Sequence, residues 1–286
     1  MTEPRRTGHI ALAGTPNVGK SSLLNRLVGS HLAIVSPKAQ STRLPVIGLL
    51  TEGDTQYIFH DLPGLLAPEY LLHARMRSAA QAALQGVHII LHLHPAADWP
   101  APPFWPLTGL EAPLDIPVMT VFTKADLLPA AARARITDGI LVSAETGTGI
   151  PELLAAIRPH LPAGEFEFDP DDVGTQPVRF FATEYIREAA FANLEDEVPY
   201  GVAAEVEEFR EHTRPVYIRV TLLVERDSQK GIVIGRGGRT LKAIGQQARA
   251  RLESLLGEPV YLDCWVKVLP NWRRNAASLD RLGFPA

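Results

Sequence analysis

One segment limits the fold more than any other: a glycine-rich loop that joins a short apolar strand to a helix. The apolar run from His9 to Ala13 predicts the strand, the run GTPNVGKS follows it, and helical residues begin directly afterwards. The loop fits the pattern G-x-x-x-x-G-K-[ST], in which backbone N–H groups at a helix N-terminus and one lysine surround phosphate groups. This order predicts an α/β fold, with a mostly parallel sheet and helices on both of its faces. The candidate nucleotide-binding residues of the loop are Gly14, Asn17, Val18, Gly19, Lys20, Ser21 and Ser22.

A second strand supplies an aspartate that suits magnesium. It ends in the run DLPG, about forty residues after the phosphate loop. Asp61 is placed there to hold Mg²⁺ together with Ser21, while the Gly64 N–H meets a γ-phosphate. In isolation, an aspartate at a strand end is more often a turn former. In the polar run AQSTR between the two motifs, Thr42 is the predicted magnesium ligand and Ser41 is the competing choice. We expect Lys20, Thr42, Asp61 and Gly64 to act in catalysis.

A third group of residues predicts the base that the site accepts. A strand that ends at Phe122 runs into Thr123, Lys124, Ala125 and Asp126. A buried carboxylate at Asp126 would accept hydrogen bonds from guanine N1–H and from the 2-amino group, which adenine cannot supply. Lys124 is expected to pack its stem over the ribose and the loop. The later run Ser143, Ala144, Glu145 is expected to offer a backbone N–H to guanine O6. The sequence therefore favours a guanine nucleotide.

Strands and helices alternate through this first part of the chain. Further apolar runs predict strands at residues 46–50, 57–60, 87–93, 118–122 and 139–142, with helical patterns between several of them. Residues 94–117 are crowded with proline and tryptophan and predict irregular structure. His88, His92 and His94 lie close together, but they lack acidic or cysteine neighbours. We therefore interpret them as core or edge residues and not as metal ligands.

Over residues 8 to about 160, these motifs resemble those of the small P-loop GTPases of the translation-factor class. The resemblance implies that the chain binds GTP and GDP with Mg²⁺ and hydrolyses GTP. Thr123 stands where this class usually has asparagine, and its shorter side chain offers fewer hydrogen bonds between the loop and the base site, so we predict weaker nucleotide binding. Leu65 stands where Ras-like proteins have a glutamine that orients water, so we predict slow hydrolysis. Related GTPases suggest that a potassium ion near Asn17 completes the site.

The second half of the chain has a different order and a local positive charge. It predicts a helix at 179–193, strands at 201–209 and 216–225, two helices within 229–256, a strand at 260–268 and a short terminal helix. The whole chain has a formal net charge of -4, but residues 226–251 contain seven basic residues and one acid. A basic helix can simply be a solvated face. Here, the run GRGG between two helices favours a KH fold, whose glycine loop clamps about four nucleotides of RNA. The candidate RNA-binding residues are Lys230, Ile234, Gly235, Arg236, Gly237, Gly238, Arg239 and Lys242.

Length and composition fit two domains in a reducing compartment. The 286 residues exceed what one core usually supports, and residues 161–177 are rich in acids, glycine and proline without a period. We expect a GTP-binding domain at 1–165, a linker at 166–177 and an RNA-binding domain at 178–286. No apolar run is long enough to span a bilayer, and the one cysteine, Cys264, cannot form an internal disulfide. Both features favour a cytoplasmic protein, which we expect to be a monomer.

The runs QSTR, DLPG, VER, VIG and WVKV occur in this order, and together they resemble the Era family over nearly the whole chain. The resemblance implies an α/β P-loop GTPase domain followed by an α+β type II KH domain. It also implies recognition of the 3′ end of small-subunit ribosomal RNA and GTP-dependent docking on the assembling small ribosomal subunit. Peripheral contact with the inner face of the cell membrane is a further implication.

Two other interpretations stay open. One is a metabolic P-loop enzyme such as a kinase, which Asp126 and the DLPG run disfavour, since the sequence offers no acceptor site. The other is a constitutive RNA-binding protein with a largely structural nucleotide site. Thr123 and Leu65 keep this second interpretation open, and it predicts equal RNA affinity with GTP and with GDP. The acidic residues Glu205, Glu207, Glu208 and Glu211 predict a solvated face that repels RNA.

Overall fold

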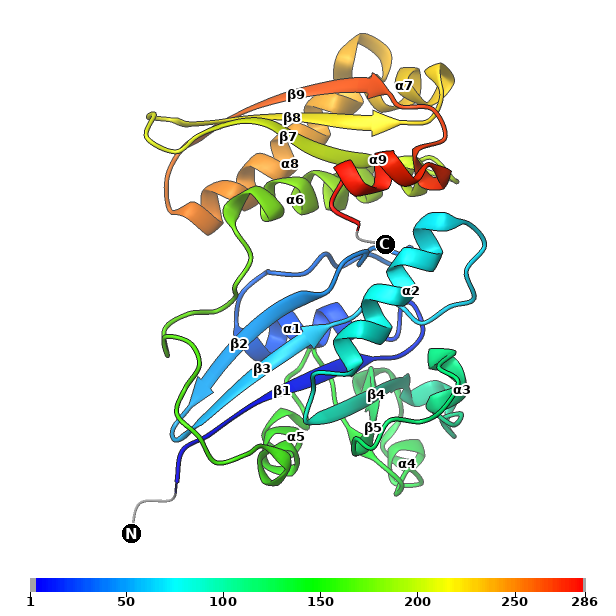
Figure 1. The fold of residues 1–286 in the computed structure, drawn as a ribbon, viewed down its shortest axis with the longest axis vertical. Coiled ribbons are helices and arrows are strands. Elements are labelled where there is room, and N and C mark those ends of the chain that lie inside the picture. Colours follow the sequence, from blue (N-terminus) through cyan, green and yellow to red (C-terminus); the bar gives the residue numbers. More distant parts are fainter. Residues whose placement is uncertain (1–3, 285–286) are drawn as a thin grey trace. The chain divides into compact units, whose positions relative to one another are not determined.

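The structure, a computed structural model, describes residues 4–284 and divides into two compact units. Unit 1 contains residues 4–33, Thr42–Pro68 and Met76–Thr175. Unit 2 contains Ile34–Ser41, Glu69–Arg75 and residues 176–284. Each unit has its own sheet, as Figure 1 shows.

A six-stranded sheet with the order β2-β3-β1-β4-β5-β6 forms the centre of unit 1. β2 pairs antiparallel with β3, and the other pairs are parallel. In this register Leu12 lies beside Asp61, so the ends of β1 and β3 are neighbours. Because the loops after parallel strands gather at one edge of a sheet, the predicted nucleotide motifs share that edge. The strands are β1 (Arg6–Ala13), β2 (Val46–Glu52), β3 (Thr55–Asp61), β4 (Ile89–Pro95), β5 (Val118–Thr123) and β6 (Ile140–Leu141).

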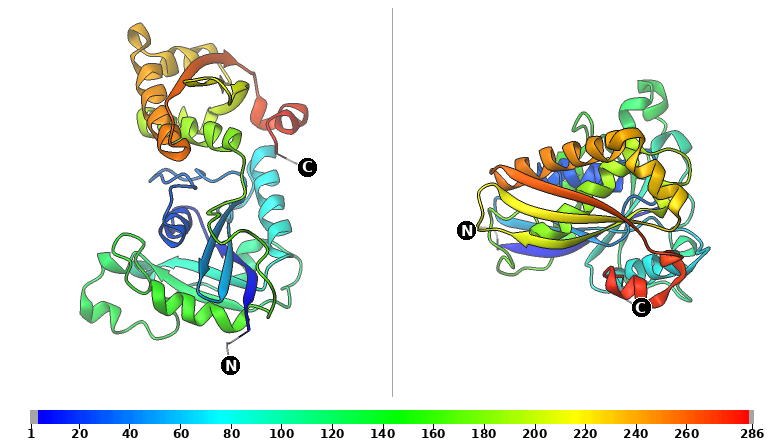
Figure 2. Two further views of the ribbon diagram at one scale, coloured as in Figure 1. Left: turned by 90° about the vertical axis from the view of Figure 1, so that its left-hand side faces the viewer. Right: turned by 90° about the horizontal axis from the view of Figure 1, so that it is seen from above.

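Helices α1 (Lys20–Val28) and α2 (Leu71–Leu84) cover opposite faces of this sheet (Figures 1 and 2). On one face, a Cβ atom at Gly48 of β2 would lie 2.5 Å from Leu24 of α1, so the glycine lets the helix approach closely. On the other face, Ala80 and Leu84 of α2 join Ala11 of β1 in a hydrophobic cluster. The remaining helices of unit 1 are α3 (Trp105–Thr108), α4 (Ala130–Arg133) and α5 (Ile150–Ile157).

Unit 2 combines a three-stranded sheet, in the order β7-β8-β9, with helices that pack on one of its faces. β7 is antiparallel to β8, and β9 is parallel to it. Trp272 is completely buried, and its indole N–H donates a hydrogen bond to the carbonyl oxygen of Gly201 at 2.9 Å. The elements are α6 (Val178–Asn193), β7 (Ala203–Arg210), β8 (Val216–Val224), α7 (Asp227–Ile234), α8 (Arg239–Leu256), β9 (Val260–Val268) and α9 (Ala276–Arg281).

The predicted fold class is confirmed, and the structure has a strand or helix at each position where the sequence predicted one. Residues 94–117, predicted as irregular, contain the one-turn helix α3. The acidic segment after Leu161 lies along unit 1, where Gln56 Oε1 accepts hydrogen bonds from the backbone N–H groups of Glu167 and Phe168 at 2.8 and 3.0 Å. The limits of the two domains stay a prediction. No helix within residues 4–284 has both the length and the apolar character needed to cross a membrane.

Two histidines of the sheet, His60 and His92, predict that the free energy of unfolding depends on pH. Burial lowers the pKa of His60 and of His92 to about 4, with a smaller contribution from the neighbouring His9 and His94. Since an unfolded histidine titrates near 6.5, the unfolded chain binds more protons than the folded chain between pH 6.5 and 4. We therefore expect the free energy of unfolding to decrease as the pH falls through this window, by at most about 3 kcal/mol for His92.

Urea unfolding of unit 1, followed by circular dichroism at several pH values, measures this effect. The His92→Gln variant should show a smaller pH dependence than the wild type, and the variant His160→Gln, at an exposed histidine of unit 1, should not differ from it. Equal pH dependence in the wild type and the His92→Gln variant would contradict the assignment.

Candidate functional site

The glycine-rich loop takes a backbone path that side chains would block. A Cβ atom at Gly14 would lie 2.4 Å from the carbonyl oxygen of Leu93, so this position accepts only glycine. Asn17 adopts a left-handed conformation with φ of 63°. α1 begins at Lys20, directly after Gly19. The loop and the helix N-terminus together form a concave backbone surface of the kind that binds phosphates.

The ammonium group of Lys20 is buried within this loop. The side chain is 6% exposed, and Nζ donates hydrogen bonds to the carbonyl oxygens of Gly14 and Thr15 at 3.2 and 2.9 Å. Burial lowers its pKa to about 8, although the nearby Asp61 carboxylate opposes the change. A buried cation in this state is stabilised when a phosphate supplies negative charge.

Ser21, Thr42 and Asp61 bring three oxygen atoms together at the ends of β1 and β3. Ser21 Oγ donates to Asp61 Oδ2 at 2.6 Å, and Thr42 Oγ1 lies 2.9 Å from Ser21 Oγ and 3.3 Å from Asp61 Oδ2. Burial raises the pKa of Asp61 to about 6, and within residues 4–284 its Oδ1 atom has no hydrogen-bond partner. A buried, unpaired carboxylate oxygen beside two hydroxyl groups fits Mg²⁺, which prefers oxygen ligands. Ser41, the competing choice, groups with unit 2 and not with these residues.

Gly64 lies against the glycine-rich loop, whereas Leu65 points into the core. A Cβ atom at Gly64 would lie 2.7 Å from Pro16 Cγ and 2.9 Å from the Pro16 backbone nitrogen. The Leu65 N–H donates to the Gly14 carbonyl oxygen at 3.0 Å, and its side chain is buried in the hydrophobic cluster beneath α2. Leu65 therefore cannot orient a water molecule at the phosphates.

The predicted base site is assembled from the ends of β5 and β6. The ammonium group of Lys124 donates to the Asn17 carbonyl oxygen at 2.8 Å, which holds the lysine stem across the glycine-rich loop. The Ala125 N–H donates to the Val142 carbonyl oxygen, so the two loops are tied together. Ser143 is buried, Ala144 is partly exposed and Glu145 is exposed.

One expectation about this site is wrong. Asp126 is exposed and not buried, because it lies on a short 3₁₀ turn at the rim of the sheet and not inside it. The carboxylate therefore lies at the surface of unit 1.

In unit 2, the glycine loop joins α7 to α8 as the sequence predicted. A Cβ atom at Gly235, where φ is 73°, would lie 2.2 Å from Thr240 Oγ1, so a side chain there would displace the start of α8. Lys230 and Ile234 lie on α7, and Arg239 and Lys242 lie on α8. Among the described residues, no acid forms an ion pair with Lys230, Arg236, Arg239 or Lys242.

A groove with a volume of about 380 Å³ lies between α8 and β9. Gly238 and Lys242, which the sequence predicted as RNA-binding residues, line this groove, but the sequence did not predict the rest of its wall. Residues three to four positions apart share one face of a helix. This spacing along α8 could therefore have predicted which helical residues line the groove. The missed residues are Leu241, Gly245, Gln246, Arg249, Leu262 and Cys264.

Comparisons with known proteins cover both units. Residues 9–124 match a family described as 50S ribosome-binding GTPase, and residues 197–273 match the KH domain family. The GTPase Era of Geobacter metallireducens is 38% identical over 294 residues, and that of Carboxydothermus hydrogenoformans is 37% identical over 291 residues. Each alignment covers 98% of this chain and 98% of the relative. The chain belongs to the GTPase Era family. It is therefore a GTPase.

Two solved Era structures are similar to the whole chain. A variant of Aquifex aeolicus Era bound to GDP and aluminium fluoride is 35% identical, with a TM-score of 0.91, and the match covers 98% of this chain and 100% of that one. Era in complex with MgGDPNP and nucleotides 1506–1542 of 16S ribosomal RNA is 34% identical, with a TM-score of 0.93. That match covers 99% of this chain and 100% of the other.

Thr123, which stands where small P-loop GTPases usually have asparagine, still links the base site to the glycine-rich loop. Its hydroxyl group donates to the Val18 carbonyl oxygen at 2.5 Å and also lies 3.3 Å from the His94 carbonyl oxygen. The shorter side chain thus still reaches the loop through one buried hydrogen bond. Weaker nucleotide binding than in relatives with asparagine stays a prediction.

The Thr123→Val variant removes this hydrogen bond and keeps the shape of the side chain. Because a buried hydrogen bond contributes about 1 to 1.5 kcal/mol, we expect GDP to dissociate roughly tenfold faster. Release of a fluorescent GDP analogue measures the rate. The Thr51→Val variant on β2 is the matched control and should release GDP at the wild-type rate.

The Thr123→Asn variant tests the weaker binding itself and should release GDP more slowly than the wild type. Unchanged release in both Thr123 variants would show that this position does not set nucleotide affinity.

Proposed function

We propose that the protein is a GTP-dependent switch that binds the 3′ end of small-subunit ribosomal RNA and assists assembly of the small ribosomal subunit. The observation that carries this proposal is the similarity, over 99% of the chain, to Era in complex with MgGDPNP and a segment of 16S ribosomal RNA. The groove beside the unpaired basic residues of α7 and α8 is the surface that would receive the RNA. Its apolar wall suits bases, and its cations suit phosphates.

The geometry of unit 1 supports specific roles in GTP hydrolysis. In this proposal Lys20 contacts the β- and γ-phosphates, and the Gly64 N–H contacts the γ-phosphate. Ser21, Thr42 and Asp61 would hold Mg²⁺, which neutralises charge between the phosphates when it is bound. The loop residues Gly14 to Ser22 would enclose the phosphates, while Thr123, Lys124, Asp126 and the run Ser143 to Glu145 would surround the guanine.

The domain limits and the cellular location belong to the same proposal. The GTP-binding domain covers residues 1–165, the linker 166–177 and the KH domain 178–286. We expect a monomer in the cytoplasm, with peripheral contact at the inner face of the cell membrane. Cell fractionation of the tagged protein tests the location, and light scattering tests the oligomeric state.

A second candidate is a constitutive RNA-binding protein with a largely structural nucleotide site. The buried side chain of Leu65 favours it, because no glutamine is present there to orient water. The two candidates differ in one observable property. The switch binds RNA differently in its GTP and GDP forms, whereas the constitutive protein does not.

The decisive experiment measures binding of a labelled oligonucleotide with the 3′ end of 16S ribosomal RNA. The protein is loaded either with a non-hydrolysable GTP analogue or with GDP, and controls are a scrambled RNA and a large-subunit RNA segment. Tight binding of the 16S sequence in the GTP form alone supports the switch. Equal binding in both forms supports the constitutive alternative, and no preference for the 16S sequence removes the assembly role.

The Arg236→Glu variant should weaken this RNA binding at least tenfold and reduce its salt dependence, since a phosphate contact is lost and a like charge is introduced. Fluorescence anisotropy at several salt concentrations measures both quantities. The exposed Arg135→Glu variant in unit 1 makes the same change of charge and should bind RNA like the wild type. Equal losses in the two variants would show that net charge, and not the glycine loop, governs binding.

Potassium dependence tests how hydrolysis proceeds without a glutamine at residue 65. If a potassium ion near Asn17 completes the site, GTP hydrolysis should be several times faster in KCl than in NaCl at equal ionic strength. Phosphate release under single-turnover conditions measures the rates. The Asn17→Ala variant should lose the difference between the salts. Equal wild-type rates in both salts would exclude the ion.

A further inference from the structure

The chain passes from unit 2 to unit 1 directly before Thr42. Residues Ile34–Ser41 belong to unit 2 and Thr42 belongs to unit 1, so the boundary falls at the peptide bond that joins Ser41 to Thr42. Thr42 is 7% exposed, and its hydroxyl group lies beside Ser21 and Asp61. The position of this threonine therefore depends in part on what holds the segment before it.

One helix of unit 2, α6, holds this segment. The Val35 N–H donates a hydrogen bond to Glu188 Oε1 at 3.1 Å. Lys38 Nζ donates to the Phe191 carbonyl oxygen at 2.7 Å, near the C-terminal end of the helix. Cations are favoured at that end, because the last carbonyl groups of a helix lack partners within it. α6 thus contacts the segment at two positions before Ser41.

A third contact reaches the last residue of the segment through a buried arginine. Arg187 Nη2 donates a hydrogen bond to the Ser41 carbonyl oxygen at 2.7 Å. Nη1 of the same guanidinium group pairs with Glu184 Oε1, one helical turn earlier. Arg187 is 5% exposed and Glu184 is 8% exposed. The guanidinium group is therefore held by the helix and presents one N–H to the Ser41 carbonyl group.

The buried ion pair is a weak source of stability for α6. Two charges lose their hydration when they are buried, and this cost is often as large as their attraction. In addition, Arg187 Nε has no hydrogen-bond partner within residues 4–284. Apolar side chains of similar volume would fill the same two positions at least as well. The hydrogen bond to Ser41, and not the stability of the helix, therefore accounts for an arginine at this position.

A hydrogen bond to the Ser41 carbonyl oxygen constrains Thr42 directly. The peptide group is planar, so the carbonyl oxygen of one residue and the Cα atom of the next lie in one rigid plane. When Arg187 holds this oxygen, it fixes the plane that ends at the Thr42 Cα atom. Only rotations about the N–Cα and Cα–Cβ bonds then place the hydroxyl group, and the second rotation is restricted in threonine.

We propose that Arg187 is a positioning residue for GTP hydrolysis, which fixes the Ser41 carbonyl group and thereby the approach of Thr42 Oγ1 to Mg²⁺. The inference rests on the magnesium role proposed for Thr42. Arg187 acts through the chain and touches neither the nucleotide nor the metal. Its effect lies in the Mg²⁺ concentration that hydrolysis requires, because a threonine that is not held must lose conformational freedom when it binds the ion.

The test measures single-turnover GTP hydrolysis by the full chain at a series of Mg²⁺ concentrations. The Glu184→Met/Arg187→Met double variant removes the donor to Ser41 without leaving a buried, unpaired Glu184. We expect it to need about tenfold more Mg²⁺ for half-maximal hydrolysis, in line with the loss of one buried hydrogen bond. At saturating Mg²⁺ it should hydrolyse GTP at nearly the wild-type rate.

Hydrogen exchange gives a second readout that does not depend on catalysis. In the form loaded with Mg²⁺ and a non-hydrolysable GTP analogue, the backbone amides of residues 38–43 should exchange several times faster in the double variant than in the wild type. Exchange in β7, β8 and β9 should be unchanged, which would show that unit 2 keeps its fold.

Three single variants separate the hydrogen bond from other effects. Glu184→Gln removes the ion pair but keeps the Arg187 donor, so it should need the wild-type Mg²⁺ concentration. Arg179→Met removes an exposed arginine from the same helix and should also match the wild type. Thr42→Ala removes the proposed ligand and should raise the Mg²⁺ requirement at least as much as the double variant does.

The inference is overturned if the double variant keeps the wild-type Mg²⁺ requirement while Thr42→Ala raises it. A lower rate at every Mg²⁺ concentration, with an unchanged requirement, would show that Arg187 only supports the fold. An equal rise in Glu184→Gln would show that the ion pair, and not the hydrogen bond to Ser41, is responsible. An unchanged requirement in Thr42→Ala would contradict the proposed magnesium role itself, so the two failures are distinguishable.

Discussion

The nucleotide site depends on a buried pair of opposite charges, Lys20 and Asp61, at the ends of two adjacent parallel strands. Burial pushes each group toward its neutral form, and the attraction between them opposes this change. The two groups satisfy each other only in part, because Asp61 Oδ1 has no hydrogen-bond partner among the described residues and the Lys20 ammonium donates to the carbonyl oxygens of Gly14 and Thr15. A phosphate would place negative charge beside Lys20, and a magnesium ion would place positive charge beside Asp61.

The rest of unit 1 brings these two groups together. Parallel pairing aligns Leu12 with Asp61, and the small residues of β1 allow α2 to pack closely on the sheet. Gly64 then meets Pro16 of the glycine-rich loop, so the two motifs touch through their backbones. Leu65 belongs to the core beneath α2, and this position explains why it cannot act on water. The family's activity therefore needs another way to position the nucleophile.

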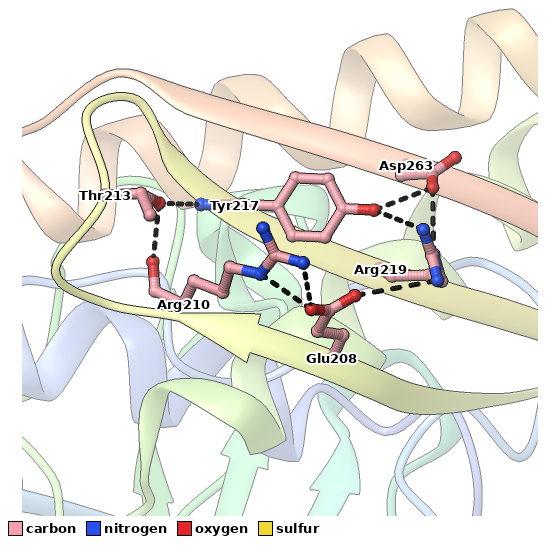
Figure 3. Close-up of polar contacts among 6 residues, drawn as sticks. All are labelled: Glu208, Arg210, Thr213, Tyr217, Arg219 and Asp263. Atoms are coloured by element: carbon pink, nitrogen blue, oxygen red, sulfur yellow. Dashed lines mark hydrogen bonds and ion pairs between the residues drawn. The ribbon is translucent and has the colours of Figure 1, made fainter.

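Unit 2 presents chemically different surfaces on the two faces of one strand. Inward residues of β9 and one face of α8 form the groove, where the glycine loop brings unpaired cations. Outward residues of the same strand carry aromatic rings in a neutral hydrogen-bonded network (Figure 3). The strict alternation of side chains along a strand makes this separation possible. A change on one face can thus leave the other intact.

The sequence by itself determined the order of strands and helices and the positions of both glycine loops. These features depend on residues that are close together in the sequence, so they can be recognised without knowledge of the tertiary structure. Only the tertiary structure decided that Asp126 is exposed, that Thr42 and not Ser41 joins Ser21, and that Thr123 still reaches Val18. It also decided that the acids of β7 are paired with Arg219, Lys267 and Arg281, because these partners are distant in sequence and meet the acids only through sheet register and packing.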